Sequence, residues 1–268
     1  MAENGLFPVS LVRHRNRFWR RFTSYQFVAE MDACPIVISE VPQIATSFPI
    51  VFLSNQTGFS PVALFSVIPE IAPPFVDQNG RWLAPYVPSA LRCFPFQAEA
   101  LKKGDSRSRL FVDEDSGLVT HDPKDQPFFT VDGLLTQDLC DVRRFLQNRL
   151  ASANKTDQVC SLIAEMGLLV PLDEQNGITL TEGYWGVDPI LLERLPESNK
   201  LALLSSGALR LIHAHQVSLS HCMWLSSAQS QSGTRSSEQK DTFGGFMTAL
   251  AEEVRHGQCK EGAIHAMG

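Results

Sequence analysis

The order of hydrophobic and polar residues changes character near residue 135. Before that point, short runs of β-branched and aromatic residues alternate with turn-forming residues, and most runs begin or end at a proline. Such runs are typical of strands. The runs that predict strands are residues 35–39, 49–54, 61–69, 109–115 and 127–133. Asn79-Gly80 and Asp132-Gly133 indicate turns, and residues 40–48 predict one short helical turn.

Beyond residue 135 the apolar residues follow the three- and four-residue spacing of helices. Thr136 suits the N-cap of a first helix, Gly167 suits the end of a second, and Asp188 followed by Pro189 predicts the start of a third. The expected helices are residues 136–152, 155–167, 188–195 and 206–227. Between them, residues 168–172 and 178–187 predict a pair of strands around a turn at Asn176-Gly177.

These patterns predict an α+β fold. A mostly antiparallel, β-rich N-terminal half, residues 1–134, would precede a helical C-terminal half, residues 135–227, that packs on it. Residues 228–268 begin with a stretch rich in Ser, Gln and Thr that has little to bury. We expect a disordered linker and a short terminal helix there, so that truncation at about residue 227 leaves the melting temperature nearly unchanged.

The composition narrows the class of protein. The chain has 268 residues, 44% hydrophobic and 19% charged, which is enough apolar matter for a sizeable core. A formal net charge of −6 argues against a general nucleic-acid-binding protein. The N-terminus lacks the apolar segment of a secretory signal, and no stretch has the roughly 18 uninterrupted apolar residues of a membrane span. We therefore expect a cytoplasmic protein, with its scattered cysteines reduced.

The common catalytic signatures are missing, and no motif indicates a particular cofactor. His213 and His215 would share a face on a strand, but their surroundings are helical, and helix positions two apart point about 200° apart. We interpret both as packing or surface residues and predict no metal site. His121 next to Asp122 lacks the usual spacing of the iron ligands in 2-oxoglutarate oxygenases, so it gives that activity only weak support.

The segment 80–96 concentrates prolines and aromatic residues, which predicts a rigid, extended or turning connection. Trp82 and Tyr86 would supply core or pocket walls, core packing being the favoured role. Glu40 ends an apolar run and is expected to be partly buried, so it needs a partner, for which Arg81 and Arg92 are candidates. An ion pair that pins the segment to the sheet is favoured over catalysis. The alternative is that an arginine faces a pocket and holds an anion.

Residues 13–21 carry several arginines, together with His14 and two aromatic residues. One interpretation is a basic site for phosphate or an acidic partner. The favoured interpretation is an N-terminal strand or turn whose arginines pair with acidic residues elsewhere. The candidate binding residues from the whole sequence are Glu40, Arg81, Trp82, Tyr86, Arg92 and His14.

Read in order, the segments resemble the bacterial SapC family. The matching segments are HRNRFWR, YQFVAE, CPIVISEVPQIATSFPIVF, GRWLAPYVPSALRCFPF, PFFTVDG, LLVPL, GYWGVDPILLERL and SGALRLIHAHQVSL, which together span about residues 13–225. Two positions depart from the family pattern. Arg92 is followed by Cys93 instead of a second arginine, and Pro73-Pro74-Phe75 stands where Asn-Leu-Phe is usual. Any role that needs the second arginine or the asparagine is not carried over.

The resemblance implies little chemistry. The family is named after a bacterial surface-array locus, and its members look like accessory proteins encoded beside flavin-dependent halogenases and outer-membrane receptors. No catalytic residues can be carried over from it. The first hypothesis is therefore an accessory protein that binds a peptide or protein partner. The alternative is a metal-dependent, iron and 2-oxoglutarate type oxygenase that modifies a peptide or small metabolite. It requires His14, His121, His213 and an acidic residue to lie close to one another.

Overall fold

The computed structural model of the protein describes residues 5–56, 58–101 and 108–234. Within these ranges, antiparallel sheets lie in the N-terminal half and the helices lie mostly in the C-terminal half, which confirms the expected α+β class. No helix of this part of the chain is long and apolar enough to cross a membrane.

The largest described sheet has five antiparallel strands in the order β10-β13-β4-β5-β3. Its strands are β3 (Ala33–Pro35), β4 (Ile50–Asn55), β5 (Gly58–Leu64), β10 (Leu169–Pro171) and β13 (Tyr184–Val187). β4 and β5 form a hairpin that closes at the pair Asn55 and Gly58. β13 pairs with β4. The helical half of the chain therefore contributes two strands to the sheet of the N-terminal half.

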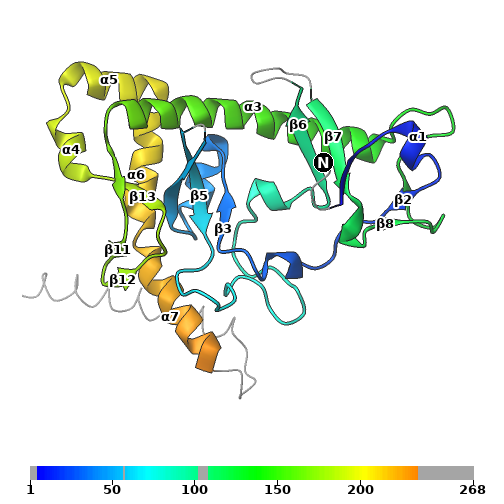
Figure 1. Ribbon diagram of the computed structural model, residues 1–268, viewed down its shortest axis with the longest axis horizontal. Helices are drawn as coiled ribbons and strands as arrows, with labels where there is room; N and C mark the ends of the chain where they lie inside the picture. Colours follow the sequence, from blue (N-terminus) through cyan, green and yellow to red (C-terminus); the bar gives the residue numbers. More distant parts are fainter. Residues whose placement is uncertain (1–4, 57, 102–107, 235–268) are drawn as a thin grey trace, which may run out of the picture.

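Smaller sheets complete the β structure. At the opposite end of the molecule (Figure 1) lie two three-stranded sheets, in the orders β1-β7-β6 and β8-β2-β9. Their strands are β1 (Leu6–Pro8), β2 (Phe18–Trp19), β6 (Phe96–Ala100), β7 (Ser108–Asp113), β8 (Val119–Thr120) and β9 (Gln126–Pro127). β11 (Glu174–Gln175) and β12 (Ile178–Thr179) form a hairpin. Its turn is the expected Asn176-Gly177, whose φ angles of 52° and 78° are those that a tight hairpin favours.

The helices are unequal in length. The α-helices are α1 (Leu11–His14), α2 (Val41–Ile44), α3 (Gln137–Glu165), α4 (Pro189–Arg194), α5 (Glu197–Ser206), α6 (Ala208–Ser218) and α7 (His221–Thr234). The 3-10 helices are η1 (Gln26–Val28), η2 (Ile38–Glu40), η3 (Ser89–Leu91) and η4 (Glu114–Ser116). Helix α3, 29 residues long, runs along the molecule above both groups of strands (Figure 1).

The core consists of two hydrophobic clusters that α3 connects. Leu139 and Leu146, near its start, are buried in the smaller cluster with residues of β2, β6 and β7. Val159 and Ile163, near its end, are buried in the larger cluster with the five-stranded sheet and α6. The clusters cut across the expected boundary at residue 134, because each one draws side chains from both sides of it.

The structure corrects two of the predicted strands. Residues 35–39 do not form a strand, because β3 ends at Pro35 and η2 follows. Strand β9 ends at Pro127, and the rest of the run 127–133 enters a turn in which Thr130 N–H donates to the Leu134 carbonyl. Both runs are apolar because side chains such as Val37 and Phe128 are buried, not because they belong to a strand.

The helix boundaries also differ from those expected. Residues 137–165 form one helix, since no glycine or proline interrupts this stretch. The expected helix 206–227 is divided into α6 and α7, with a break at Leu219 and Ser220. The boundary at residue 227 is wrong, because α7 continues to Thr234 with Gln229 buried against the loop after β5. The remaining residues of the expected linker and terminal helix, 235–268, lie outside the described residues.

Candidate functional site

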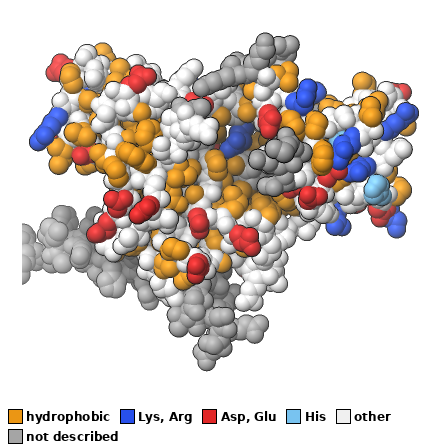
Figure 2. Space-filling model, viewed as in Figure 1, with side chains coloured by type: hydrophobic (Ala, Val, Ile, Leu, Met, Phe, Trp, Pro, Cys, Tyr) orange, Lys and Arg blue, Asp and Glu red, His pale blue; other side chains and the backbone are white. Residues whose placement is uncertain are grey.

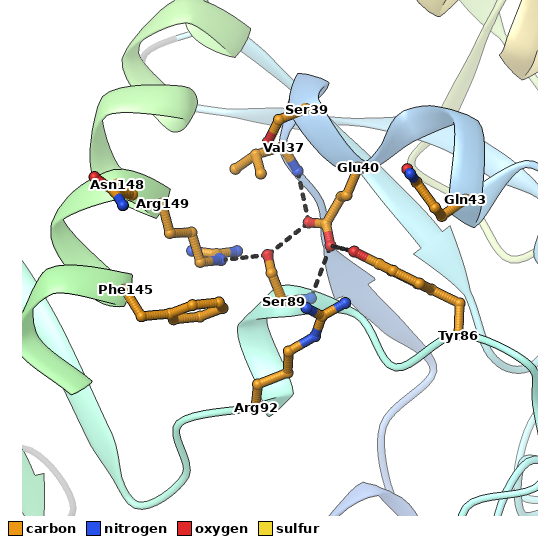
Figure 3. Close-up of a pocket in the computed structure, with 10 residues that line it drawn as sticks. All are labelled: Val37, Ser39, Glu40, Gln43, Tyr86, Ser89, Arg92, Phe145, Asn148 and Arg149. Carbon is orange, nitrogen blue, oxygen red and sulfur yellow. Dashed lines mark hydrogen bonds between the residues drawn. The ribbon is translucent and has the colours of Figure 1, made fainter. Parts of the chain in front are cut away.

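A cavity of about 410 Å³ opens where α3 passes two segments from the N-terminal half. One segment is η2 with α2, and the other is the proline-rich stretch around η3 (Figure 3). The residues that line the cavity are Val37, Ser39, Glu40, Gln43, Tyr86, Ser89, Arg92, Phe145, Asn148 and Arg149. We call it the Glu40 cavity, after the buried carboxylate that the three segments surround.

Glu40 is positioned by a short local turn. Its backbone N–H donates to the Val37 carbonyl at 3.0 Å, and the Val37 N–H donates back to Glu40 Oε1 at 3.0 Å. Pro42 stands in the first turn of α2, where no backbone donor is required. The turn is fixed to α3 by the Ile38 N–H, which donates to Thr156 Oγ1 at 2.9 Å. The apolar run before Glu40 thus ends in a turn that directs the carboxylate inward.

The proline-rich stretch supplies donors to that carboxylate. Pro88 is the N-cap of η3, so the backbone N–H of Ser89 is free of helical bonds and donates to Glu40 Oε2 at 2.7 Å. The Trp82 indole N–H donates to the Tyr86 carbonyl at 3.0 Å, which holds the loop before η3. The concentration of proline and aromatic residues in 80–96 therefore fixes a loop whose backbone and side chains point at Glu40.

Glu40 is 4% exposed and accepts four hydrogen bonds. Oε1 accepts from Val37 N–H at 3.0 Å and from the Ser89 hydroxyl at 2.7 Å. Oε2 accepts from Ser89 N–H at 2.7 Å and from the Tyr86 hydroxyl at 3.0 Å. An ionised carboxylate offers about four acceptor positions, so every position of Glu40 is occupied. The hydrogen-bonding capacity of the carboxylate is therefore met by groups of the protein itself.

Tyr86 stays a hydrogen-bond donor over the whole physiological pH range. Burial, followed by the negative charge of Glu40, raises the pKa of Tyr86 to about 12. The phenol therefore stays protonated and donates a hydrogen bond to Glu40 Oε2. Its ring serves a second purpose, because the guanidinium of Arg92 lies over it with Cζ 4.7 Å from the ring centroid.

Two arginines reach the cavity from different elements (Figure 3). Arg149 extends from α3 and donates through Nε to Ser89 Oγ at 3.0 Å and through Nη2 to the Pro35 carbonyl at 3.1 Å. Arg92 follows η3 and donates through Nε to the Val87 carbonyl at 2.8 Å. Among the described residues neither arginine forms an ion pair, and Glu40 is the only acidic residue of the lining. The cavity therefore carries two guanidinium groups that lack anionic partners.

The structure brings together Glu40, Tyr86 and Arg92 of the six candidate residues. The expected ion pair is wrong, because Glu40 takes hydroxyl and backbone donors and pairs with neither Arg81 nor Arg92. The Arg81 side chain is exposed outside the cavity, and its backbone N–H donates to Asp77. Trp82 packs against Phe48, Phe65 and Phe75 of the larger cluster, as the favoured core role predicts.

His14 lies in a different part of the molecule. It is fully buried against Phe128, and its Nε2 is 3.2 Å from Glu114 Oε1 without hydrogen-bond geometry. Arg13 and Arg17 pair with the same carboxylate, as the favoured interpretation of residues 13–21 predicts. Arg21 pairs with Asp138. Figure 2 shows a gathering of basic side chains at the end of the molecule with α1, β2 and β8.

Sequence reasoning missed Ser89 and Arg149. Ser89 lies inside the proline-rich stretch but was not singled out, because a single serine there matches no motif. Arg149 is far along the chain, and a helical arginine resembles any solvated charge. Its one available signal is its place one turn after Phe145, since both then lie on the same side of α3 and line the cavity.

The histidines do not gather around an acidic residue. His213 is exposed on α6, whereas His215 is buried and hydrogen-bonded to the backbone of Ile50 and Val187. His121 is exposed beyond β8. Within the described residues, no group of three or more His, Cys, Asp or Glu side chains is arranged to hold a metal ion. The arrangement that the oxygenase alternative requires is therefore not found in this part of the chain.

Comparison with known proteins gives one result. The family model described as SapC matches residues 9–225, which is most of the chain and includes every residue that lines the Glu40 cavity. This confirms the resemblance on which the accessory hypothesis rests. No curated protein and no solved structure matches the chain.

Proposed function

The chain belongs to the SapC family, and we propose that it is an accessory protein that binds a peptide or protein partner at the Glu40 cavity. The observation that carries the proposal is the pair of guanidinium groups, Arg92 and Arg149, that face a cavity without an anionic partner among the described residues. Unpaired arginines in a preformed cavity are typical of recognition sites.

Binding is favoured over catalysis by the state of the other polar groups. Glu40 has no free lone pair, and the pKa of Tyr86, raised to about 12, makes its phenol a poor base. The Ser89 hydroxyl donates to Glu40 and its oxygen accepts from Arg149, so Ser89 and Glu40 are both engaged in the wall of the cavity. These groups build a rigid wall, and the arginines are left to contact a ligand.

The test is affinity purification of tagged protein from its native host, followed by quantitative mass spectrometry. The wild type is compared with Arg92→Met and with Arg81→Met, a matched loss of an exposed arginine outside the cavity. We expect a partner that is retained by the wild type and Arg81→Met and lost with Arg92→Met. A set of proteins that is the same for all three chains would contradict binding at this cavity.

A further inference from the structure

We infer that the group received by the Glu40 cavity is an organic carboxylate, bound by Arg92 and Arg149. The identity of the partner rests on the proposed function, but the chemistry of the bound group rests on the cavity alone. Three features support it: the unused donors of the arginines, the way in which the fold holds them, and the balance of charge around them.

The unused donors are on the outer nitrogens. A guanidinium carries five N–H donors. Within the described residues, Arg92 uses Nε for the Val87 carbonyl and its two outer nitrogens make no hydrogen bond. In the same part of the chain, Arg149 uses Nε and Nη2 and leaves Nη1 without a hydrogen-bond partner. These planar N–H groups match the two oxygens of a carboxylate, which arginine binds in a forked geometry.

Both arginines are held before a ligand arrives. Arg149 is fixed at two points, the Ser89 hydroxyl and the Pro35 carbonyl, and it rises from a helix. Arg92 is fixed by the Val87 carbonyl and by the ring of Tyr86 beneath it. Side chains that are already ordered lose little rotamer entropy on binding, so a small ligand group can be bound with useful affinity.

The charge balance favours a monoanion. Glu40 lines the same cavity and its charge offsets one of the two guanidinium charges, which leaves a single positive charge in excess. A carboxylate neutralises that excess, whereas a phosphate dianion adds a second negative charge beside Glu40. The half-buried ring of Phe145 supplies an apolar wall for carbon atoms attached to the carboxylate.

The test uses small probes of defined charge and NMR detection of the arginine Nε–H signals. N-acetylglycine carries a chain-terminal carboxylate, and amidated N-acetylaspartate carries a side-chain carboxylate. N-acetylglycinamide is the uncharged control, and inorganic phosphate is the competing anion. We expect at least one carboxylate probe to shift the signals of Arg92 and Arg149 in a saturable way, about tenfold more tightly than phosphate. Tighter binding of N-acetylglycine identifies the end of a peptide as the source of the carboxylate. Tighter binding of amidated N-acetylaspartate identifies a side chain.

Variants separate the site from the surrounding surface. Arg92→Met should weaken the better carboxylate about tenfold, and Arg92→Lys should restore only part of that loss, since an ammonium lacks the fork. Arg81→Met should bind like the wild type, and the Trp82 indole N–H signal reports whether each variant keeps the fold around the cavity. The inference is overturned if N-acetylglycinamide shifts the same signals equally, if phosphate binds more tightly, or if no probe saturates.

The outcome is separable from the proposed function. If a carboxylate binds but Arg92→Met loses no partner in cells, the carboxylate site stands and the partner proposal fails. If a partner depends on Arg92 but no carboxylate probe binds, the partner proposal stands and the choice of ligand group is wrong.

Discussion

Glu40 shows how a buried charge is stabilised here by donors that are themselves neutral. Hydrogen bonds to ionised groups contribute about 1.5–3 kcal/mol each, and they are not additive. Glu40→Gln keeps the size of the side chain but turns one acceptor into a donor that faces the donors of Ser89 or Tyr86. We predict that this change lowers the free energy of unfolding by about 3 kcal/mol, measured by urea denaturation at neutral pH.

The matched control is Gln43→Ala. Gln43 lines the same cavity, but its exposed side chain makes no hydrogen bond within the described residues. Its replacement should change the free energy of unfolding by no more than about 0.5 kcal/mol. Equal losses in the two variants would show that the effect comes from disturbing the cavity rather than from the carboxylate.

The sequence identified the residues of the cavity only where a local pattern marked them. Glu40 was found because a charge ends an apolar run, and Arg92 and Tyr86 because they lie in a stretch of unusual composition. The ion pair between Glu40 and Arg92 was a wrong inference, since the sequence does not reveal that backbone N–H groups and hydroxyls already satisfy the buried acid. Arg149 reaches the site only through the tertiary packing of α3, which no local pattern encodes.

At the scale of elements, α7 is fixed to the loop after β5 by the buried side chain of Gln229. Gln229 is fully buried, and its amide oxygen accepts from the N–H groups of Val67 and Ile68 at 2.8 and 3.1 Å. Its amide nitrogen donates to Ser66 Oγ and to the Ile71 carbonyl, both at 2.8 Å. These bonds satisfy backbone N–H and carbonyl groups of the loop after β5, which pair with no strand within the described residues. Because the stretch that begins at residue 228 is rich in Ser, Gln and Thr, the sequence did not indicate that Gln229 is buried.

We therefore predict that Gln229→Ala lowers the free energy of unfolding by about 2–3 kcal/mol, because it leaves buried backbone groups without partners. Thermal or urea denaturation measures the change. Gln231→Ala, at an exposed position of the same helix, is the control and should have little effect. Truncation at residue 227 should likewise lower the melting temperature. An unchanged melting temperature would restore the original expectation that the chain beyond 227 is dispensable.

Element types were easier to predict than element boundaries. The turn at Asn176-Gly177 and the cap of α4 at Asp188 were predicted because each depends on a few adjacent residues. The sequence did not predict that α3 is one continuous helix. Its polar middle section has a weak apolar pattern, and the helix is stabilised by packing at both ends. Likewise, η2 was mistaken for a strand because its apolar residues are buried.

For the whole molecule, the buried histidine of α6 predicts sensitivity to acid. The Nδ1–H of His215 donates to the Ile50 carbonyl at 2.6 Å, and Nε2 accepts from Val187 N–H at 3.1 Å, so the ring is neutral. Burial lowers the pKa of His215 from 6.5 to about 4. Between these pH values the unfolded chain binds a proton that the folded protein does not, and stability falls as the pH falls.

A second loss of stability follows at lower pH and comes from Glu114. Hydrogen bonds from Arg13 and Arg17 lower the pKa of Glu114 from 4.5 to about 2, so its contribution is complete above pH 4.5 and is lost as the pH falls toward 2. We predict that the free energy of unfolding declines below pH 6.5, by an amount on the order of 2–3 kcal/mol before pH 4.5 is reached. His215→Gln should reduce the decline in the free energy of unfolding between pH 6.5 and 4.5 and leave the decline below pH 4.5 unchanged. A wild-type stability that is constant from pH 6.5 to 4.5 would contradict the account.

The central claim is that Arg92 and Arg149 are available to a ligand and that neither forms an ion pair with Glu40 within the described residues. The most direct test is the free energy of unfolding of Arg92→Met without ligand, measured by urea denaturation beside the wild type. The hydrogen bonds to Glu40 remain intact in this variant, so we predict a loss of less than about 1 kcal/mol, which reflects the single bond to the Val87 carbonyl. A loss of about 3–5 kcal/mol, typical of a broken buried ion pair, would contradict the claim and show that Arg92 stabilises the carboxylate.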